Sequence, residues 1–163
     1  MTPNIIRSRQ SIRLKGYDYS RVGCYFITLC TQNRVCLFGQ IKNSKLILNT
    51  TGQMIDFQWT DLKNKYPTIV LDSHIVMPNH LHGIITVGAP LKSPDTIGSI
   101  IGRFKSITTY THIQQIRAAQ AHPFNRKLWQ RNYYEHIIRD ADELRRIRKY
   151  ILENPAHWAF NKT

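Results

Sequence analysis

The chain has 163 residues, of which 42% are hydrophobic and 20% are charged. This length and composition suit one globular domain spanning residues 1–163, and they exclude a disordered chain. The 23 Lys and Arg residues against 10 Asp and Glu residues leave a formal net charge of +13, which favours a polyanionic partner. No apolar run approaches the roughly 20 residues of a membrane span, and the start of the chain lacks the apolar segment of a secretory signal. We therefore expect a soluble, cytoplasmic protein with no membrane partner.

The first part of the chain predicts an arm followed by strands. Residues 1–20 are basic and poor in apolar residues, so they are typical of an N-terminal arm, and we expect the core to begin at about Gly23. Residues 24–32 are rich in β-branched and aromatic side chains, which predicts a strand. Residues 35–41 and 45–49 flank the turn signal Lys42-Asn43-Ser44, and this pattern indicates a hairpin.

Residues 50–66 predict an amphipathic helix. Thr50 and Gln53 have the spacing of a capping box, and Pro67 ends the pattern. The apolar stripe of this helix consists of Ile55, Trp59, Leu62 and Tyr66. Two strand-like stretches follow at 68–78 and 81–87, and Pro78 interrupts them.

The second half predicts two more helices and one strand. Ser93 can cap a helix that has Pro94 in its first turn. The apolar stripe of that helix consists of Ile97, Ile100, Ile101, Phe104 and Ile107. Residues 119–127 resemble a loop, and residues 128–138 predict an aromatic-rich strand. A last helix begins near Asp140 and stops at Pro155; its stripe consists of Leu144, Ile147 and Ile151.

This order of elements predicts an α+β fold. Strands and helices alternate after an initial hairpin, which suits a mainly antiparallel sheet with helices on one face. We expect a ferredoxin-like, RRM-like sandwich.

Two histidines stand out in the stretch "VMPNHLHGIITV" at residues 76–87. Residues i and i+2 of a strand project from the same face, so His80 and His82 can converge on one cation while Leu81 points into the core. Pro78 can end strand pairing before them, and Gly83 allows a backbone or ligand to come close. Two core histidines with satisfied ring nitrogens are the alternative.

Four motifs in order resemble one known family. The chain resembles the REP-associated tyrosine transposases of the HUH single-strand endonuclease superfamily in the motifs "VMPNHLHGII", "GSIIGRFKS", "LWQRNYYEHIIRD" and "YILENP". The resemblance as a whole runs from about Gly23 to Trp158. The resemblance implies that His80 and His82 bind a divalent cation, Mg²⁺ or Mn²⁺, and that Tyr150 is the nucleophile. It also implies a third, amide ligand at Asn154.

Helix geometry agrees with these assignments, because Tyr150 and Asn154 are four residues apart and therefore share a helix face. Alternatives remain open. Tyr150 can instead be an ordinary half-buried helix residue, and Tyr133 and Tyr134 are rival nucleophiles. His136 can be a further ligand, a proton carrier or a structural residue.

Basic and aromatic side chains are candidates for holding DNA, because phosphate contacts provide affinity and aromatic rings stack on bases. The candidates are Arg13 and Lys15 in the arm, Arg103 and Lys105 on the second helix, and Arg126, Lys127 and Arg131 around Trp129. Each charge can also be a solvated surface group. The chain lacks the Gly-Arg-Ser-Gly stretch with which some family members read bases.

The resemblance implies a metal-dependent transposase and endonuclease that cleaves and rejoins single-stranded or hairpin DNA through a 5′-phosphotyrosine. It would act as a monomer or a homodimer. The alternatives are a catalytically inactive nucleic-acid-binding module of the same fold and a replication-initiator or relaxase type of nuclease.

Overall fold

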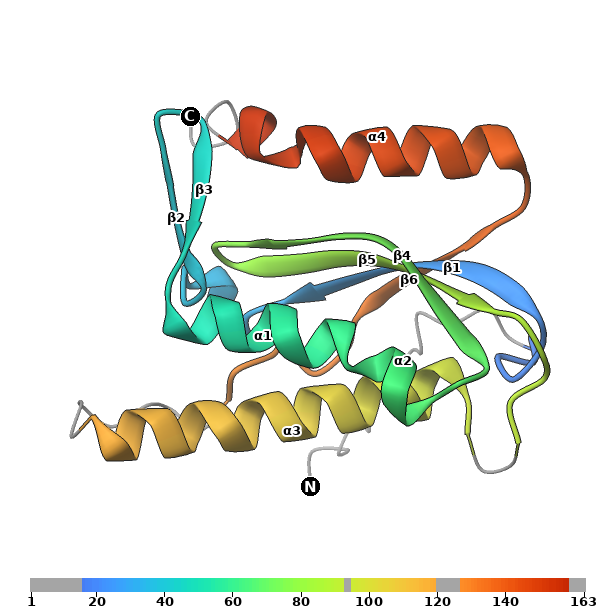
Figure 1. The fold of residues 1–163 in the computed structure, drawn as a ribbon, viewed down its shortest axis with the longest axis horizontal. Helices are drawn as coiled ribbons and strands as arrows, with labels where there is room; N and C mark the ends of the chain where they lie inside the picture. The colour runs from blue at the N-terminus through green and yellow to red at the C-terminus, as the bar shows by residue number, and fades with distance from the viewer. Residues whose placement is uncertain (1–15, 93–94, 120–126, 159–163) are drawn as a thin grey trace, which may run out of the picture.

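The computed structural model describes residues 16–92, 95–119 and 127–158. Its main sheet is antiparallel, with strand order β4-β5-β1-β6 (Figure 1). The strands are β1 (Gly23–Cys30), β4 (Ile69–Met77), β5 (His80–Val87) and β6 (Tyr134–Ile138). This order, with helical connections from β1 to β4 and from β5 to β6, is that of a ferredoxin-like sandwich, so the predicted fold class is confirmed.

Helices cover both faces of the sheet (Figure 1). On one face lie α1 (Thr50–Thr60), α2 (Leu62–Lys65) and α3 (Ile97–Ala118), and on the other lies α4 (Ala141–Trp158). The expectation of helices on one face therefore holds for the crossover helices and fails for α4. None of the helices in the described part of the chain is both long and apolar enough to span a bilayer.

The second face receives α4 because the strands are apolar on both sides. Tyr25, Ile27 and Leu29 point into the larger core, under α1 and α3. Phe26 and Ile84 point the other way and pack with Ile138 and Ile151 in a smaller core. The α4 stripe of Leu144, Ile147 and Ile151 covers this smaller core, as its spacing predicted.

A hairpin stands beside the sheet. It consists of β2 (Gly39–Lys42) and β3 (Lys45–Leu48), and its turn places Asn43 and Ser44 at φ 50° and 58°. The hairpin prediction is confirmed. Its tip lies near the C-terminal end of α4 (Figure 1), and a short 3₁₀ turn, η1 (Gln32–Arg34), comes before it. Together these elements form one wall of the space between α4 and the sheet.

Helix α1 begins and ends differently from the prediction. Asn49, not Thr50, is its N-cap, and the Asn49 side chain accepts a hydrogen bond from the Gly52 amide. Asn49 also donates to the Leu37 carbonyl, which ties the cap to the hairpin. The predicted single helix is divided at Asp61 into α1 and α2.

The ends of α3 and α4 also differ from the prediction, because they depend on contacts that the spacing of apolar residues does not reveal. Thr96 caps α3 in a capping box with Ser99, whereas Ser93 and Pro94 lie outside the described residues. Pro155 lies inside α4 and does not stop it. It lies so close to the helix end that its missing N–H removes a hydrogen bond only from the final turns.

Two strand expectations also change. The aromatic segment 128–138 is a strand only from Tyr134, because Trp129 makes an isolated bridge to Thr31 and turns its ring into the core. At the start of the chain, Tyr19 is buried in the larger core, so packing begins before Gly23. Residues 1–15 of the expected arm lie outside the described residues.

Candidate active site

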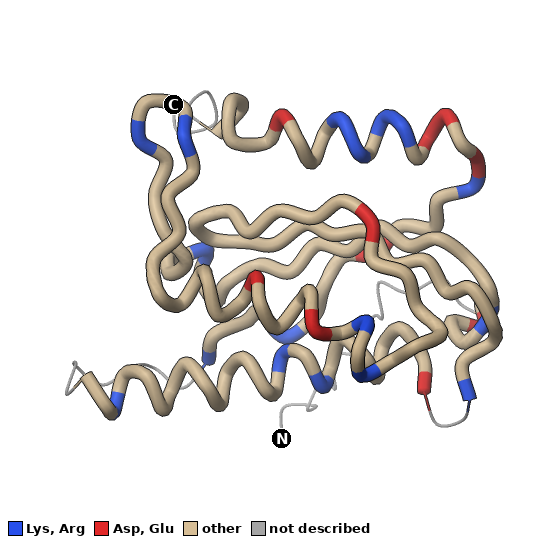
Figure 2. Tube along the Cα trace, in the orientation of Figure 1, with Lys and Arg blue, Asp and Glu red and all other residues tan. Residues whose placement is uncertain are grey.

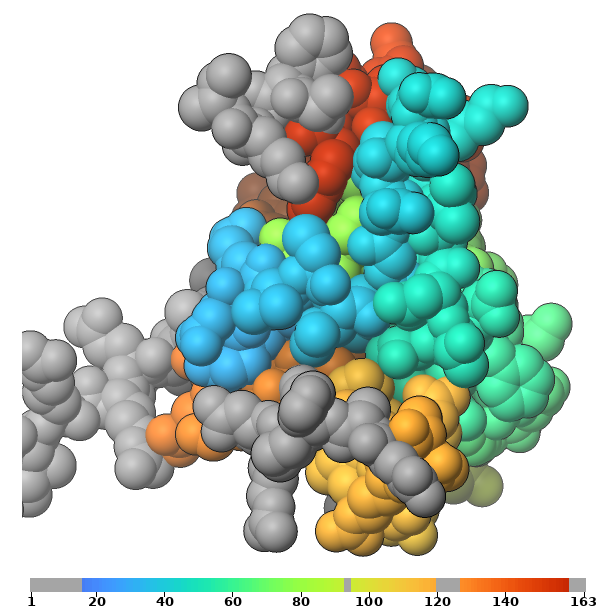
Figure 3. Space-filling view, turned by 90° about the vertical axis from the view of Figure 1, so that its left-hand side faces the viewer, coloured from blue at the N-terminus to red at the C-terminus, as the bar shows by residue number. Residues whose placement is uncertain are grey.

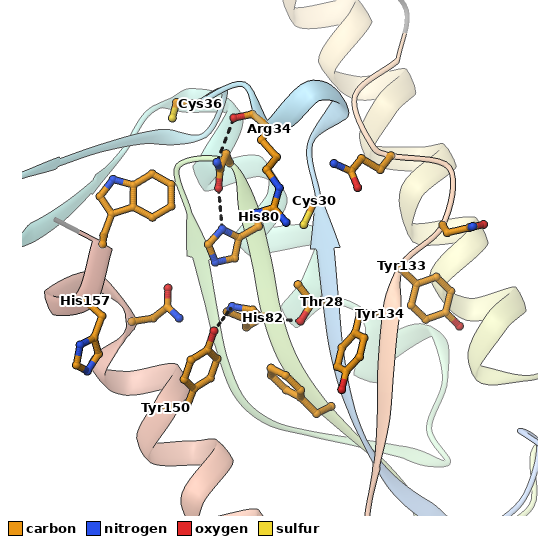
Figure 4. Close-up of a pocket in the computed structure, with 16 residues that line it drawn as sticks. Thr28, Cys30, Arg34, Cys36, His80, His82, Tyr133, Tyr134, Tyr150 and His157 are labelled. Atoms are coloured by element: carbon orange, nitrogen blue, oxygen red, sulfur yellow. Dashed lines mark hydrogen bonds between the residues drawn. The ribbon is translucent and has the colours of Figure 1, made fainter. Parts of the chain in front are cut away.

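His80 and His82 lie side by side on β5, on the face that α4 covers. Their ring centroids are 4.5 Å apart. Leu81 between them is fully buried in the larger core on the opposite face. The alternation expected of a strand is thus confirmed, and both imidazoles face the space beneath α4 (Figure 4).

Each histidine is oriented by a hydrogen bond at Nδ1. The His82 Nδ1 lies 2.8 Å from the hydroxyl of Thr28, its direct neighbour on β1. The His80 Nδ1 donates to the Asn79 side-chain oxygen at 2.7 Å, and the Asn79 amide nitrogen donates to the Arg34 carbonyl, which sets the orientation of the amide. The lone pair of His80 is therefore at Nε2.

Both imidazoles are neutral at pH 7. Burial lowers the pKa of His82 to about 3, and the neighbouring His80 adds to the effect. Burial also lowers the pKa of His80 to about 4, although a hydrogen bond to the Asn154 side chain acts in the opposite direction and raises it. Neutral imidazole is the form that binds metal ions.

Helix α4 brings a tyrosine and an asparagine to this pair. The Tyr150 hydroxyl lies 3.4 Å from the His82 Nε2, and the buried Asn154 side chain hydrogen-bonds to His80. The Tyr150 side chain is 48% exposed, and its ring makes an edge contact with Phe26, which stacks on His82. One docking of α4 therefore delivers both predicted residues to both histidines.

An ion pair between α4 and β4 holds this docking in place. The Arg148 guanidinium donates to both carboxylate oxygens of Asp72, at 2.9 and 2.6 Å. Arg148 is two residues before Tyr150, so the pair acts close to the tyrosine. Ile151 follows three residues after Arg148, hence on the same side of the helix, and is buried in the smaller core.

The side chains of His80, His82, Tyr150 and Asn154 line a cavity of about 900 Å³. Figure 3 shows its surroundings from the side: η1, the β2–β3 hairpin and α4 enclose a hollow in which the end of the β4–β5 pair is visible. Its further lining residues include Arg34, Tyr134 and Trp158; Tyr134 was considered as a rival nucleophile, whereas Arg34 and Trp158 were not predicted as part of the site. They come from three separate segments, and no local pattern connects them to the histidines.

The structure separates the rival residues. Tyr133 and Tyr134 both line the same cavity. Tyr134 is 55% exposed and lies across from Tyr150, whereas Tyr133 is partly buried and also packs against the larger core (Figure 4). His136 lies 2.7 Å from the Glu143 carboxylate, which also accepts from the Arg139 amide. His136 thus joins β6 to the first turn of α4, which is a structural arrangement.

Gly83 makes room for a side chain of the core. A Cβ added there would lie 2.2 Å from the Trp59 ring, which belongs to α1. The close approach that this glycine permits is therefore to an indole and not to a ligand.

The predicted DNA-binding residues have different positions. Arg13, Lys15 and Arg126 lie outside the described residues. Trp129 is 6% exposed and donates its indole N–H to Thr108, so the structure contradicts its predicted role of stacking on bases.

The remaining basic candidates lie outside the histidine cavity. Arg103 pairs with Asp95, and Lys105 donates to two backbone carbonyls of residues 130 and 131, so both have structural partners. Lys127 and Arg131 are exposed and border a separate groove along α3. Figure 2 places further Lys and Arg residues on the β2–β3 tip and along α4.

A metal ion at this site would depend on an amide ligand. Within residues 16–92, 95–119 and 127–158, no group of three or more His, Cys, Asp or Glu side chains is arranged to hold a metal. Two neutral imidazoles and the Asn154 amide nevertheless converge in one cavity. This mixed nitrogen and oxygen set fits a divalent cation that keeps several positions for water or phosphate oxygen.

Fold and site together define a class. Two histidines on a central strand, faced by a tyrosine on a helix, form the arrangement predicted from the resemblance to HUH-type transposases, which are DNA-processing proteins. The chain belongs to the IS200-like transposase family, because the model of that family, described as "Transposase IS200 like", matches residues 24–154.

Individual proteins are similar to this chain in sequence or in fold. An uncharacterized protein of Haemophilus influenzae is 39% identical over 172 residues, covering 94% of this chain and 91% of that protein. The structure of a REP-associated tyrosine transposase bound to a REP hairpin has a TM-score of 0.62 at 22% identity and covers 89% of this chain and 73% of that one. A putative transposase from Deinococcus radiodurans has a TM-score of 0.53 at 14% identity, covering 89% and 98%. The two structures show a shared fold, and the resemblance drawn from the motifs is confirmed.

Proposed function

We propose that this transposase is a metal-dependent, single-tyrosine endonuclease and strand transferase for single-stranded or hairpin DNA. The observation that carries the proposal is the 3.4 Å separation between the Tyr150 hydroxyl and the His82 Nε2, with Asn154 on the same helix bonded to His80. A phenol that lies half-exposed in an open cavity is available to a substrate, in contrast to a tyrosine packed in the core.

The proposed reaction is a transesterification. The Tyr150 oxygen attacks the scissile phosphorus, its proton passes to water in the open cavity, and the bond from phosphorus to the 3′ oxygen breaks. The leaving oxygen takes a proton from water and becomes a free 3′-hydroxyl, while the 5′ phosphate stays on Tyr150. The phosphodiester count is unchanged, so a 3′-hydroxyl can reverse the attack and rejoin strands without ATP.

His80, His82 and Asn154 would hold Mg²⁺ or Mn²⁺. When bound, the cation would supply Lewis-acid activation of the scissile phosphate. Neighbouring residues hold the two imidazoles in a form suited to bind a cation: Thr28 and Asn79 orient them, and burial keeps both neutral. In the tautomer with its proton on Nδ1, donated to the Thr28 hydroxyl, His82 would have one lone pair at Nε2, which could serve either the Tyr150 hydroxyl or a metal bond.

The proposed substrate class is inferred from the net charge of the chain and the volume of the cavity. The net charge of +13 favours a polyanion, and a cavity of about 900 Å³ suits a few nucleotides of single strand but not a duplex. The structural relative bound to a REP hairpin supports extending hairpin DNA to this chain. Tyr150 reaches the histidines of its own chain, which supports a site that works in cis, whether the protein is a monomer or a homodimer.

The test uses a labelled pool of DNA hairpins with randomised loops and single-stranded flanks, incubated with Mg²⁺ or Mn²⁺. We expect a covalent adduct that survives denaturing electrophoresis, is lost with a chelator, and is lost in Tyr150→Phe. Tyr134→Phe, which removes a hydroxyl from the same cavity, is the matched control and should keep the adduct. His80→Ala should lose the adduct while it retains the thermal unfolding of a folded protein.

Each alternative has its own outcome. If Tyr150→Phe forms the adduct and Tyr134→Phe does not, the nucleophile is Tyr134. If the wild-type protein binds the pool but forms no adduct with either metal, the chain is a binding module without this chemistry.

A further inference from the structure

Arg34 has an unusual position in the cavity. Among the described residues that line it, Arg34 is the sole Lys or Arg, and no Asp or Glu is present. Figure 4 shows its side chain directed toward His80 and Cys30. Burial raises the pKa of Cys30, and the charge of Arg34 partly opposes that rise. Burial lowers the pKa of His80, a hydrogen bond to Asn154 raises it, and the charge of Arg34 lowers it further. The cavity therefore contains one permanent positive charge and no lining carboxylate to neutralise it.

The backbone around Arg34 is held in an uncommon conformation. Asn33 and Arg34 have φ values of 56° and 54°, in the left-handed region that residues with a side chain rarely adopt. Thr31 anchors the turn, because its hydroxyl lies within hydrogen-bond distance of the carbonyls of Val35 and Asn79, at 2.8 and 3.0 Å. The turn is thus attached to the loop that precedes the histidine strand.

One side chain connects this turn to the histidine pair. Asn79 donates from its amide nitrogen to the Arg34 carbonyl at 3.1 Å and accepts at its oxygen from His80 at 2.7 Å. The Arg34 backbone and the His80 ring are therefore positioned by the same residue. The guanidinium therefore extends from a backbone that is held beside the imidazole.

The guanidinium has no anionic partner among the residues that the structure describes. Arg103, Arg145 and Arg148 each pair with an aspartate, whereas no carboxylate lies within ion-pair distance of Arg34. Arginine presents a planar fork that matches two oxygens of a phosphate. An unpaired fork in a cavity without carboxylates is suited to bind a phosphate that enters it.

We propose that Arg34 is the phosphate-binding residue of this site, contacting the phosphodiester that Tyr150 attacks and stabilising its negative charge during the transfer. This inference rests on the proposed function and deepens it. It assigns a role in the reaction to a residue that none of the sequence motifs includes. The side chain acts on the substrate, whereas the backbone carbonyl of the same residue acts on Asn79.

The test compares Arg34→Ala and Arg34→Lys with Lys42→Ala, which removes an exposed charge from the hairpin tip. With the hairpin pool, the initial rate of adduct formation in Arg34→Ala should fall about 10²- to 10³-fold, as for loss of one stabilising donor. Binding of the pool should fall less than about tenfold, because many other phosphate contacts remain. Lys42→Ala should react like the wild type, and Arg34→Lys should recover part of the rate.

Chemical rescue distinguishes an Arg34 guanidinium that acts on the substrate from an Arg34 side chain that is only structural. Added methylguanidinium should restore a substantial part of the rate in Arg34→Ala and leave the wild type unchanged. An Arg34→Ala protein that reacts at the wild-type rate overturns the inference, and so does a slow one that neither methylguanidinium nor Arg34→Lys improves. If Tyr150→Phe abolishes the adduct in the same experiment, either of these two results contradicts the role of Arg34 and leaves the proposed function intact. A wild-type protein without adduct defeats the proposed function and takes this inference with it.

Discussion

Replacing Gly83 by alanine tests the packing that holds the histidine strand. The added Cβ would lie 2.2 Å from Cζ2 and 2.7 Å from Cε2 of Trp59, whereas carbon atoms in contact are normally about 3.5–4.0 Å apart. The indole would have to move by more than about 1 Å. It is fully buried and has the Phe104 ring packed edge-on against it at 5.5 Å, so there is little space for such a shift.

The strand cannot easily move instead. Gly83 pairs with Ile27 on one side and His74 on the other, so β5 is held by ladders on both edges. Overpacking of this kind costs about 1–3 kcal/mol, and we expect a value near 3 kcal/mol because neither partner can yield. Urea unfolding followed by circular dichroism measures the loss of unfolding free energy.

Gly102→Ala is the matched control. Nothing lies within 4 Å of a Cβ added at Gly102, which is exposed in α3, so the protein should become more stable by about 0.5–1 kcal/mol. Combining Gly83→Ala with Trp59→Phe should recover at least about 1 kcal/mol relative to additivity. A Gly83→Ala protein as stable as the wild type would refute the reasoning about this contact.

Two further predictions concern the site and its helix. Thr28→Val removes the hydroxyl that orients His82 and should weaken Mn²⁺ binding about 10- to 100-fold in calorimetric titration. Thr28→Ser keeps the hydroxyl and should bind Mn²⁺ nearly as the wild type does. Equal Mn²⁺ affinities of Thr28→Val and the wild type would mean that the hydroxyl does not position the ring. The Arg148 hydrogen bonds lower the pKa of Asp72 to about 2 from 3.8, so the stabilisation by the carboxylate is complete above about pH 4 and is lost as the pH falls toward 2. Asp72→Asn should therefore lose about 1 kcal/mol at pH 7, after allowance for solvent screening, and the difference from the wild type in urea unfolding should shrink between pH 4 and 2; a difference that does not change with pH would contradict this assignment.

Local geometry explains the parts of the fold that the sequence predicts well. A strand repeats every two residues, so Leu81 in the core requires His80 and His82 to share the other face. A helix places residues four apart one above the other, so Tyr150 and Asn154 face the same way. These relations depend on the backbone alone and hold wherever the element packs.

Helix boundaries and the positions of single aromatic residues were predicted less well. Asn49 and Thr96 cap their helices because of the turns in which they lie, and an apolar period does not reveal which neighbour will be the cap. Trp129 was expected to stack on bases, but its ring is buried in the core and its N–H reaches Thr108. Composition cannot distinguish an aromatic residue for the core from one for a ligand.

The sequence by itself determined the kind of chemistry available: paired imidazoles on one strand, a tyrosine and an amide on one helix face, and a large excess of positive charge. Only the tertiary structure decided that α4 covers the second face of the sheet, so that Tyr150 meets His82, and that Arg34 and Tyr134 enter the same cavity. The physical reason is that side-chain direction within an element follows from backbone periodicity. The meeting of distant elements, in contrast, follows from which apolar faces bury one another, and that depends on the whole chain.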